Sequence, residues 1–274
     1  MKGKPVSESI REYIKEEVKQ LDIKPNLTVI KVGNDPASET YVNNKIKACF
    51  DVGIESTLVQ LPEDIEESEL IDIISTFNKS DKCHGLLVQL PLPEHISEEK
   101  IANAITPSKD VDCFHPYNVG RLYNEIGHIR PCTPSGVISI LQYYGIEIAG
   151  SDVVIVGRSN IVGKPLATML TNMGATVTVC HSRTKNLKEK TKAADIVVTA
   201  IGRGKYFDMS YFNENSVIVD VGINRDENGK LCGDVDYANV VDNVKAITPV
   251  PGGVGIMTVT HLLYNTLQCY LYQM

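Results

Sequence analysis

The sequence predicts an α/β protein with two domains, each built on a parallel β-sheet covered by helices. Short apolar, β-branched runs alternate with amphipathic segments along nearly all of the 274 residues, which is typical of strand–helix–strand units. Residues 85–90 are apolar almost throughout, as expected for a strand that is buried on both faces of its sheet. A chain of this length suits one large or two modest domains.

The first domain is predicted to run to about residue 120, with residues 250–274 joined to it. Apolar side chains at helical spacing predict a helix over residues 7–21, and Asp35 followed by Pro36 is a typical helix start. Further helices are expected at 36–52, 66–79 and 97–105, and strands at 27–32, 55–61 and 85–90. Residues 106–132 lack periodicity and are rich in Pro, Gly, Asp and Asn, which predicts a long functional loop or linker.

A second, doubly wound domain is predicted over residues 121–249. Thr133 and Pro134 are expected to cap a helix that runs to about Tyr144. Strands are expected at 152–157, 176–181, 195–200 and 217–221, with helices between the first three. A last helix, from about 256 to 272, is predicted to return and pack on the first domain.

Composition excludes several classes of function. The formal net charge of −7 argues against nucleic acid as a partner, because phosphate binding needs a basic face. The seven cysteines are scattered without a C-x-x-C pair, which favours reduced thiols in a cytoplasmic protein over disulfides or a metal site. The charged N-terminal segment does not resemble a signal region, and no apolar run reaches the roughly 20 residues of a membrane span.

Residues 152–165 carry the most specific local pattern. A β-branched run ends at Gly157, a tight turn follows, and Gly163 begins a predicted helix. At such a corner, backbone N–H groups and the positive end of the helix dipole point at a bound phosphate. The usual dinucleotide fingerprint is G-x-G-x-x-G, whereas here Ser159 replaces the second glycine and the last glycine comes one residue late. The pattern therefore predicts a variant dinucleotide-binding turn.

The next predicted strand ends in His181, Ser182 and Arg183. A site that prefers NAD usually has an acidic residue here, which binds the ribose 2′-hydroxyl group. A carboxylate would repel the 2′-phosphate of NADP, whereas serine and arginine can donate hydrogen bonds to it. These residue types predict NADP as the cofactor. The alternative is that Ser182 and Arg183 are ordinary loop residues.

Polar residues of the first domain are candidates for the chemistry. Tyr41 and Lys45 share a helix face, where they could stack a flat ligand and transfer protons. Gln89 lies near the C-terminal end of an apolar strand, outside which ligands bind in such sheets. Asp110 and Asp112 lie in the long loop. The alternatives are a solvated lysine, a glutamine bound to backbone and loop acids that are solvated or form turns.

Six motifs follow one another along the whole chain, at residues 32–47, 85–93, 107–112, 131–136, 157–165 and 249–255. The fifth of them reads Gly-Arg-Ser-Asn-Ile-Val-Gly-Lys-Pro. Their order and spacing resemble the bifunctional methylenetetrahydrofolate dehydrogenase/methenyltetrahydrofolate cyclohydrolase family. The resemblance implies an N-terminal catalytic domain, a Rossmann-like NADP-binding domain, a folate substrate in one-carbon metabolism and a homodimer.

On the folate side, the resemblance implies a role for each candidate. Lys45 corresponds to the catalytic lysine, and Tyr41 to the tyrosine that stacks on the folate. Gln89 corresponds to the glutamine that hydrogen-bonds the lysine, and Asp112 to the aspartate that holds the pterin ring.

On the cofactor side, the resemblance implies five residues. Gly157, Arg158 and Ser159 correspond to the cofactor turn. Ser182 corresponds to the 2′-phosphate contact, and Ile223 to a residue that lines the nicotinamide ribose.

The residue types suit the two reactions that the resemblance implies. Hydride transfer from methylenetetrahydrofolate needs positioning more than an acid or base, because nitrogen lone pairs stabilise the product cation. Hydrolysis to 10-formyltetrahydrofolate needs proton transfer. Lys45 can supply it if partial burial and the cationic substrate favour its neutral amine. Gln89 can orient that amine without fixing its charge.

Three positions depart from the family pattern. Cys113 stands where the family usually has glycine, which predicts a reshaped loop or a stiffer backbone. Ile256 replaces an expected proline near the folate, and residues 201–206 depart near the nicotinamide. Two alternatives to the bifunctional enzyme therefore stay open: a dehydrogenase with weak or absent cyclohydrolase activity, and a non-catalytic NADP-binding sensor.

Overall fold

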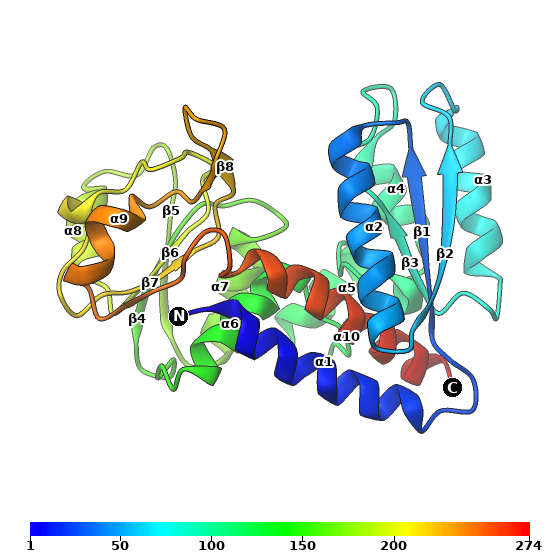
Figure 1. Ribbon diagram of the computed structural model, residues 1–274, viewed down its shortest axis with the longest axis horizontal. Coiled ribbons are helices and arrows are strands. Elements are labelled where there is room, and N and C mark those ends of the chain that lie inside the picture. The colour runs from blue at the N-terminus through cyan, green and yellow to red at the C-terminus, as the bar shows by residue number, and fades with distance from the viewer. The chain divides into compact units, whose positions relative to one another are not determined.

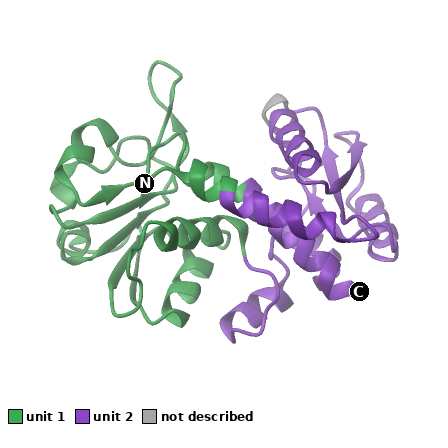
Figure 2. Cartoon of the chain, turned by 60° about the horizontal axis from the view of Figure 1, so that its bottom comes forward, with its two compact units in different colours: residues 1–8, 131–258 green, residues 9–130, 259–274 purple. Residues whose placement is uncertain are grey.

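The chain forms two compact units in a computed structural model, which describes residues 1–35 and 38–274 in full and residues 36 and 37 only as part of a helix. The three-stranded unit comprises residues 9–130 and 259–274, and the five-stranded unit comprises residues 1–8 and 131–258 (Figure 2). Within the described residues, no helix has the length and apolar character needed to cross a membrane.

The three-stranded unit is built on a parallel sheet in the order β2-β1-β3 (Figure 1). Its strands are β1 (Asn26–Val32), β2 (Glu55–Leu61) and β3 (Gly85–Val88). Its helices are α1 (Gly3–Lys19) from residue 9, α2 (Pro36–Asp51), α3 (Glu67–Asn78), α4 (Glu98–Ala104), α5 (Pro116–Tyr123) and α10 (Gly255–Gln273) from residue 259, with the 3-10 turn η1 at Pro107–Lys109.

Helices α3 and α4 cover one face of this sheet. Ile30 and Val88 from the strands pack with Leu70 and Ile74 of α3 and with Ile101 of α4. Helix α2 contacts β1 and β2 and lies on the other side of the sheet from α4 (Figure 1). Strands β1 and β3 are therefore buried on both faces, as their apolar residues predict, whereas the edge strand β2 is half-buried or exposed.

The last helix packs on the first domain, as the sequence predicts. Asn265 of α10 donates hydrogen bonds from Nδ2 to the carbonyl oxygens of Val111 and Arg130, at 2.7 Å each. Gln273 donates from Nε2 to the carbonyl oxygen of His84 at 2.7 Å. These amide side chains donate to carbonyl oxygens of the loops and so attach α10 to the three-stranded unit.

The start of α2 and the long loop show where prediction and structure meet and part. The Asp35 side chain accepts a hydrogen bond from the Ser38 N–H at 2.7 Å, which confirms it as the N-cap; the Pro36 side chain lies outside the described residues. The prediction of one long loop over 106–132 was wrong in part, because helix α5 lies inside it. His115 caps α5 by accepting from the Tyr117 N–H at 3.0 Å.

The five-stranded unit has an all-parallel sheet in the order β10-β7-β6-β4-β5. Its strands are β4 (Asp152–Val156), β5 (Thr176–Cys180), β6 (Ile196–Thr199), β7 (Val217–Asp220) and β10 (Ala246–Ile247), beside a small β8 (Asn224–Arg225) and β9 (Leu231–Cys232) pair. Its helices are α6 (Cys132–Tyr143), α7 (Gly163–Asn172), α8 (Leu187–Ala193) and α9 (Tyr237–Val240), with 3-10 turns η2 (Met209–Tyr211) and η3 (Val241–Asn243).

The order in which successive strands are added to this sheet reverses at β4, although all of the strands are parallel. The chain passes from β4 outward to β5, then returns to β6 on the other side of β4. Ligands bind in such sheets outside the carboxyl ends of the strands at this switch point. The predicted glycine turn follows β4, so the fold puts it at that position.

Two sequence predictions for this unit need correction. Helix α6 begins at Cys132 with Pro131 as its N-cap, so Thr133 does not cap it. The Thr133 hydroxyl instead shares a 3.0 Å hydrogen bond with that of Thr258. The fifth strand, β10, is only two residues long, which is too short for a periodic signal.

All seven cysteines are free and buried. Burial raises the pKa of several of these thiols, and that of Cys49 reaches about 12. They therefore behave as small apolar side chains of the core.

Candidate active site

Tyr41 and Lys45 project from α2, one helical turn apart. Lys45 is half-buried and donates a hydrogen bond from Nζ to Oε1 of Gln89 at 2.8 Å. Tyr41 is 53% exposed, so its ring is open to a flat ligand. The structure thus joins the lysine to the glutamine and leaves the aromatic face free beside them.

Gln89 directly follows β3, at the carboxyl end of the sheet. Its backbone N–H donates to the carbonyl oxygen of Ile30 at 2.8 Å, which extends the β1–β3 pairing by one residue. Its side-chain Nε2 donates to the carbonyl oxygen of Leu90, so the amide is anchored to backbone on one side and accepts from Lys45 on the other. The two roles considered for Gln89 are therefore both present.

The two acids of the long loop differ in their surroundings. Asp110 is 3% exposed and accepts hydrogen bonds from Asn118 Nδ2 at 2.9 Å and from the N–H groups of Phe114 at 3.2 Å and His115 at 2.9 Å. Burial raises the pKa of Asp110, and these hydrogen bonds lower it. Asp110 is thus fully used in holding the loop, whereas Asp112 is only partly buried.

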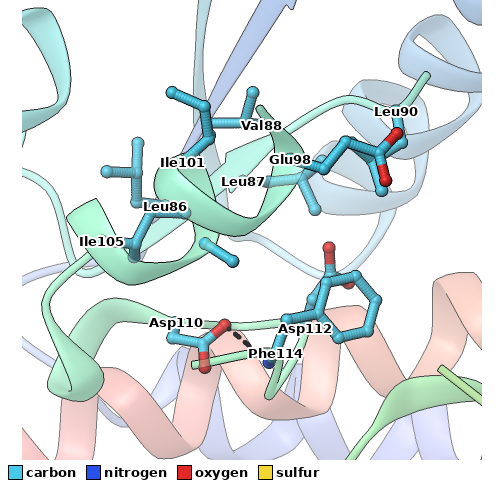
Figure 3. A pocket seen from close by; sticks show the side chains of 11 residues that line it. Leu86, Leu87, Val88, Leu90, Glu98, Ile101, Ile105, Asp110, Asp112 and Phe114 are labelled. Atoms are coloured by element: carbon cyan, nitrogen blue, oxygen red, sulfur yellow. Dashed lines mark hydrogen bonds between the residues drawn. The ribbon is translucent and has the colours of Figure 1, made fainter. Parts of the chain in front are cut away.

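A parallel bridge sets the position of Asp112. Asp110 pairs with Leu86 of β3, so Asp112, two residues on, lies level with Val88 near the carboxyl end of that strand. Both Asp112 and Val88 line a pocket of about 40 Å³ (Figure 3). This volume holds a few water molecules and is far below the roughly 300 Å³ of a typical ligand site, so the pocket itself is no folate site.

Cys113, beside Asp112, has a φ of 60°, in the left-handed region that glycine favours. The cysteine therefore keeps the backbone conformation that a glycine would take, at a cost of about 1–2 kcal/mol. The thiol is buried and donates to the carbonyl oxygen of Ile129 at 3.8 Å. Burial raises the pKa of this thiol, so it acts as a packing group.

In the five-stranded unit, the turn after β4 requires both of its glycines. Gly157 has a φ of 136°, and a Cβ there would lie 2.3 Å from the carbonyl oxygen of Ala200. A Cβ on Gly163 would lie 2.1 Å from the carbonyl oxygen of Gly157. Such close backbone approach leaves room for a phosphate at the start of α7.

Ser159, which replaces the usual second glycine, completes this turn with its side chain. Its Oγ accepts a hydrogen bond from the Val162 N–H at 3.2 Å, and its carbonyl oxygen accepts from the Lys164 N–H at 3.1 Å. The serine thus caps the turn that leads into α7. Arg158, next to it, is exposed.

The turn after β5 lies at the same edge, because Val156 of β4 pairs with Cys180 of β5. His181 and Thr184 order this turn: the His181 N–H donates to Thr184 Oγ1 at 2.8 Å, and its Nδ1 accepts from the Arg183 N–H at 3.1 Å. The side chains of Ser182 and Arg183 are exposed and take no part in these bonds.

Ile223 follows β7 at the same carboxyl edge and is 52% exposed. Its Cδ1 would lie 3.5 Å from a Cβ on Gly255, the first residue of α10. An exposed isoleucine at this position offers an apolar surface to a ligand. Ile256, which follows Gly255, is the second residue of α10. The start of this helix agrees with the predicted start to within one residue.

Sequence reasoning missed Asp220, which ends β7 and is 2% exposed. Burial raises its pKa to about 6, although hydrogen bonds from the N–H groups of Val235 and Asp234 lower it. The signal was present, since an acid at the end of an apolar strand parallels the position of Gln89.

A dinucleotide-type sheet in one unit and a lysine–glutamine pair in the other are features of a two-domain α/β enzyme that uses a nicotinamide cofactor. Residues 1–112 match the family model described as "Tetrahydrofolate dehydrogenase/cyclohydrolase, catalytic domain", and residues 131–274 match its "NAD(P)-binding domain". The chain therefore belongs to the tetrahydrofolate dehydrogenase/cyclohydrolase family.

Individual relatives agree with this assignment. The chain is 51% identical to the "Bifunctional protein FolD" of Magnetococcus marinus, over 97% of this chain and 95% of that protein. The crystal structure of the bifunctional FolD enzyme from Campylobacter jejuni matches with a TM-score of 0.97 and 48% identity, over 100% of this chain and 98% of that one. The Trypanosoma brucei enzyme, complexed with NADP cofactor and inhibitor, matches with a TM-score of 0.94 and 37% identity, over 100% and 97%.

Proposed function

We propose that the protein oxidises 5,10-methylenetetrahydrofolate with NADP and hydrolyses the resulting methenyl compound to 10-formyltetrahydrofolate. The observation that carries this proposal is the 2.8 Å hydrogen bond between Lys45 Nζ and Gln89 Oε1. A lysine held by a neutral amide can donate and accept a proton, and the hydrolysis needs such a group. The sensor alternative has no use for this pair.

Folate binding is assigned to Tyr41 and Asp112. The exposed ring of Tyr41 stacks on the flat pterin or aminobenzoyl group, which provides contact area at low entropic cost. The carboxylate of Asp112, near the carboxyl end of β3, accepts hydrogen bonds from pterin N–H groups. Together they hold the methylene carbon in one position, and positioning is the main requirement of hydride transfer.

NADP binding is assigned to the carboxyl edge of the five-stranded sheet. The close backbone approach at Gly157 and Gly163 and the start of α7 suit a pyrophosphate. Arg158 and Ser182 are exposed at the ends of adjacent strands and suit a 2′-phosphate. When bound, the nicotinamide supplies the hydride acceptor, and Ile223 shields its ribose side from water.

The hydrolysis is assigned to Lys45. In its neutral form the amine takes a proton from the water that attacks the methenyl carbon. The resulting ammonium returns this proton to the nitrogen whose bond to that carbon breaks, and the remaining hydroxyl proton of the adduct leaves to solvent as the formyl C=O forms. The cationic methenyl compound and one water thus give neutral 10-formyltetrahydrofolate and one proton. Gln89 holds the amine toward the substrate without adding a charge that would favour the ammonium.

We also infer a cytoplasmic homodimer with its domains at 1–120 plus 250–274 and at 121–249. The family resemblance supports the dimer, and the buried, free thiols suit a reducing compartment. Sedimentation velocity of the purified protein measures the assembly state, and a concentration-independent monomer would contradict the dimer.

Absorbance measurements with purified protein test the function. With methylenetetrahydrofolate and NADP, we expect methenyltetrahydrofolate and NADPH to appear and the methenyl signal then to decay to 10-formyltetrahydrofolate. Accumulation of methenyltetrahydrofolate without decay would favour the alternative, a dehydrogenase with weak or absent cyclohydrolase activity. NADP binding without turnover would favour the sensor, and faster oxidation with NAD would contradict the assignment of Ser182.

A further inference from the structure

Two buried aspartates lie at the cofactor edge of the five-stranded unit and have no part in the proposed mechanism. Asp220 is 2% exposed and Asp234 is fully buried. Buried carboxylates are rare unless hydrogen bonds compensate for their desolvation. Their partners therefore indicate what this edge of the fold is organised to hold.

Asp234 binds the loop that follows β6. Its carboxylate accepts hydrogen bonds from three successive backbone N–H groups, those of Ile201 at 2.7 Å, Gly202 at 3.3 Å and Arg203 at 2.8 Å. It also accepts from Asn224 Nδ2 at 3.0 Å. The loop itself has no strand or helix pairing at these residues, so this one side chain fixes its backbone.

Asp220 hydrogen-bonds to the end of β6, to Gly222 just after β7, and to residues 234–235. Its Oδ1 accepts from Thr199 Oγ1 at 3.0 Å, from the Gly222 N–H at 3.1 Å and from the Asp234 N–H at 3.0 Å. Its Oδ2 accepts from the Val235 N–H at 2.9 Å. The two carboxylates thus connect the ends of β6 and β7 with residues 233–235.

Two glycines make room for the carboxylates. A Cβ on Gly222 would lie 2.2 Å from Oδ1 of Asp234, and a Cβ on Gly233 would lie 1.9 Å from Oδ2 of Asp220. Each aspartate therefore lies against a glycine that is within two residues of the other aspartate in the chain. This reciprocal packing leaves the two loops little freedom to shift independently.

Ile223 lies between two residues that the pair holds, since Gly222 donates to Asp220 and Asn224 donates to Asp234. The fixed loop 201–203 begins next to Ala200, whose carbonyl oxygen closely faces Gly157. We propose that Asp234 is a positioning residue for hydride transfer, which holds loop 201–203 and Ile223 against the nicotinamide end of the cofactor. This inference rests on the proposed dehydrogenase activity.

An asparagine cannot replace Asp234 in this position. The carboxylate offers two oxygens to four donors, whereas an amide offers one oxygen and turns an NH₂ group toward backbone N–H groups. The loop and Ile223 would then lose their common anchor. The phosphate contacts assigned to Gly157, Gly163, Arg158 and Ser182 would remain.

The test compares Asp234→Asn with Asp242→Asn, which makes the same charge change at an exposed position of the same unit. We expect Asp234→Asn to lower the dehydrogenase kcat about tenfold or more, with the KM for NADP changed by less than about threefold. The NADP-independent hydrolysis of added methenyltetrahydrofolate should stay within about twofold of wild type. Asp242→Asn should leave both activities unchanged.

Several outcomes would overturn the proposal. They are an unchanged dehydrogenase kcat, or a parallel loss of both activities with a lower unfolding temperature, which indicates a purely structural role. If Asp234→Asn does not fold, Asn224→Ala removes one donor only, and a selective loss of about threefold in dehydrogenase kcat is then required. A wild-type protein without NADP-dependent oxidation would instead contradict the proposed function.

Discussion

The two units carry their proposed sites in different ways. In the three-stranded unit, the Lys45 and Gln89 side chains meet at 2.8 Å and the residue types define the chemistry. In the five-stranded unit, the cofactor edge is built largely from backbone, bent at Gly157 and held by Asp234. The activity of the first site is therefore expected to depend on which functional groups are present. The second site is expected to depend on substitutions that add side-chain volume or change the backbone conformation.

The largest effect is expected where a single functional group carries the chemistry. Replacing Lys45 with Met keeps the length of its aliphatic stem and removes its amine, so hydrolysis of methenyltetrahydrofolate should fall at least about 100-fold. Lys47→Met on the exposed side of the same helix is the control and should keep full activity. The rate of methenyl decay in absorbance is the measurement, and wild-type hydrolysis by the Lys45 variant would remove Lys45 from the mechanism.

The backbone-built site should respond most strongly to added volume. Gly222→Ala pushes a methyl group onto the Asp234 carboxylate, because the Cβ would lie 2.2 Å from Oδ1, and should lower the free energy of unfolding by about 3 kcal/mol. In the other unit, Gly120 has open space around it within helix α5. Gly120→Ala should therefore be stabilising by about 0.5–1 kcal/mol. Urea unfolding of both variants measures the contrast, which disappears if Gly222→Ala is tolerated as well.

Changing charge at the cofactor edge should alter cofactor choice and leave the fold intact. Ser182→Asp puts a carboxylate on the exposed turn after β5, where it repels a 2′-phosphate. The kcat/KM for NADP should fall about 10- to 100-fold, while that for NAD should stay equal or rise. Parallel assays with both cofactors provide their own control, and an equal loss with both would show that Ser182 matters only for the turn.

Asp220 predicts a pH dependence of the stability of the five-stranded unit. Burial raises the pKa of Asp220 to about 6 from an ordinary value of 3.8, so folding favours its protonated form. This contribution is fully present below pH 4 and is lost as the pH rises from about 4 to 6.

Wild type should therefore lose about 2 kcal/mol of unfolding free energy relative to Asp220→Asn between pH 4 and pH 7. Urea unfolding of both proteins at a series of pH values measures this difference. A difference that stays constant over the window, or that changes in the opposite direction, would contradict the raised pKa.

The smallest expected effect concerns Cys113, a position of the three-stranded unit where the backbone conformation decides which side chain fits without strain. Cys113 has a φ of 60°, so Cys113→Gly should be about 1 kcal/mol more stable than Cys113→Ala, the reverse of the order in a helix. Both variants lack the thiol, which removes its packing from the comparison. Thermal unfolding measures the order, and a more stable alanine variant would argue against strain at this residue.

The sequence predicts much of the fold because its strands are apolar runs with clear ends. The predicted strand at 55–61 coincides with β2, and the last helix was predicted within one residue at each end. Helix α5 escaped prediction because its eight residues include Pro116, Asn118 and Gly120, which are typical of loops. The strand β10 has only two residues and depends on its pairing with β7.

The candidate sites also differ in how much of each could be predicted from the sequence. The link between Lys45 and Gln89 could be predicted because the family resemblance names both residue types. The cap made by Ser159 could not be predicted from the residue type alone. The network around Asp234 could not be predicted because it joins segments up to 33 residues apart in the chain. A buried carboxylate and a partly buried one look the same in a sequence, as Asp110 and Asp112 illustrate.

The burial of every cysteine gives each unit its own internal reporter of opening. Four thiols lie in the three-stranded unit (Cys49, Cys83, Cys113 and Cys269) and three in the five-stranded unit (Cys132, Cys180 and Cys232). A thiol-alkylating reagent can reach them only when the surrounding structure opens, because folded packing excludes it. The order in which peptides gain mass would therefore rank the local stabilities of the two units without any introduced label.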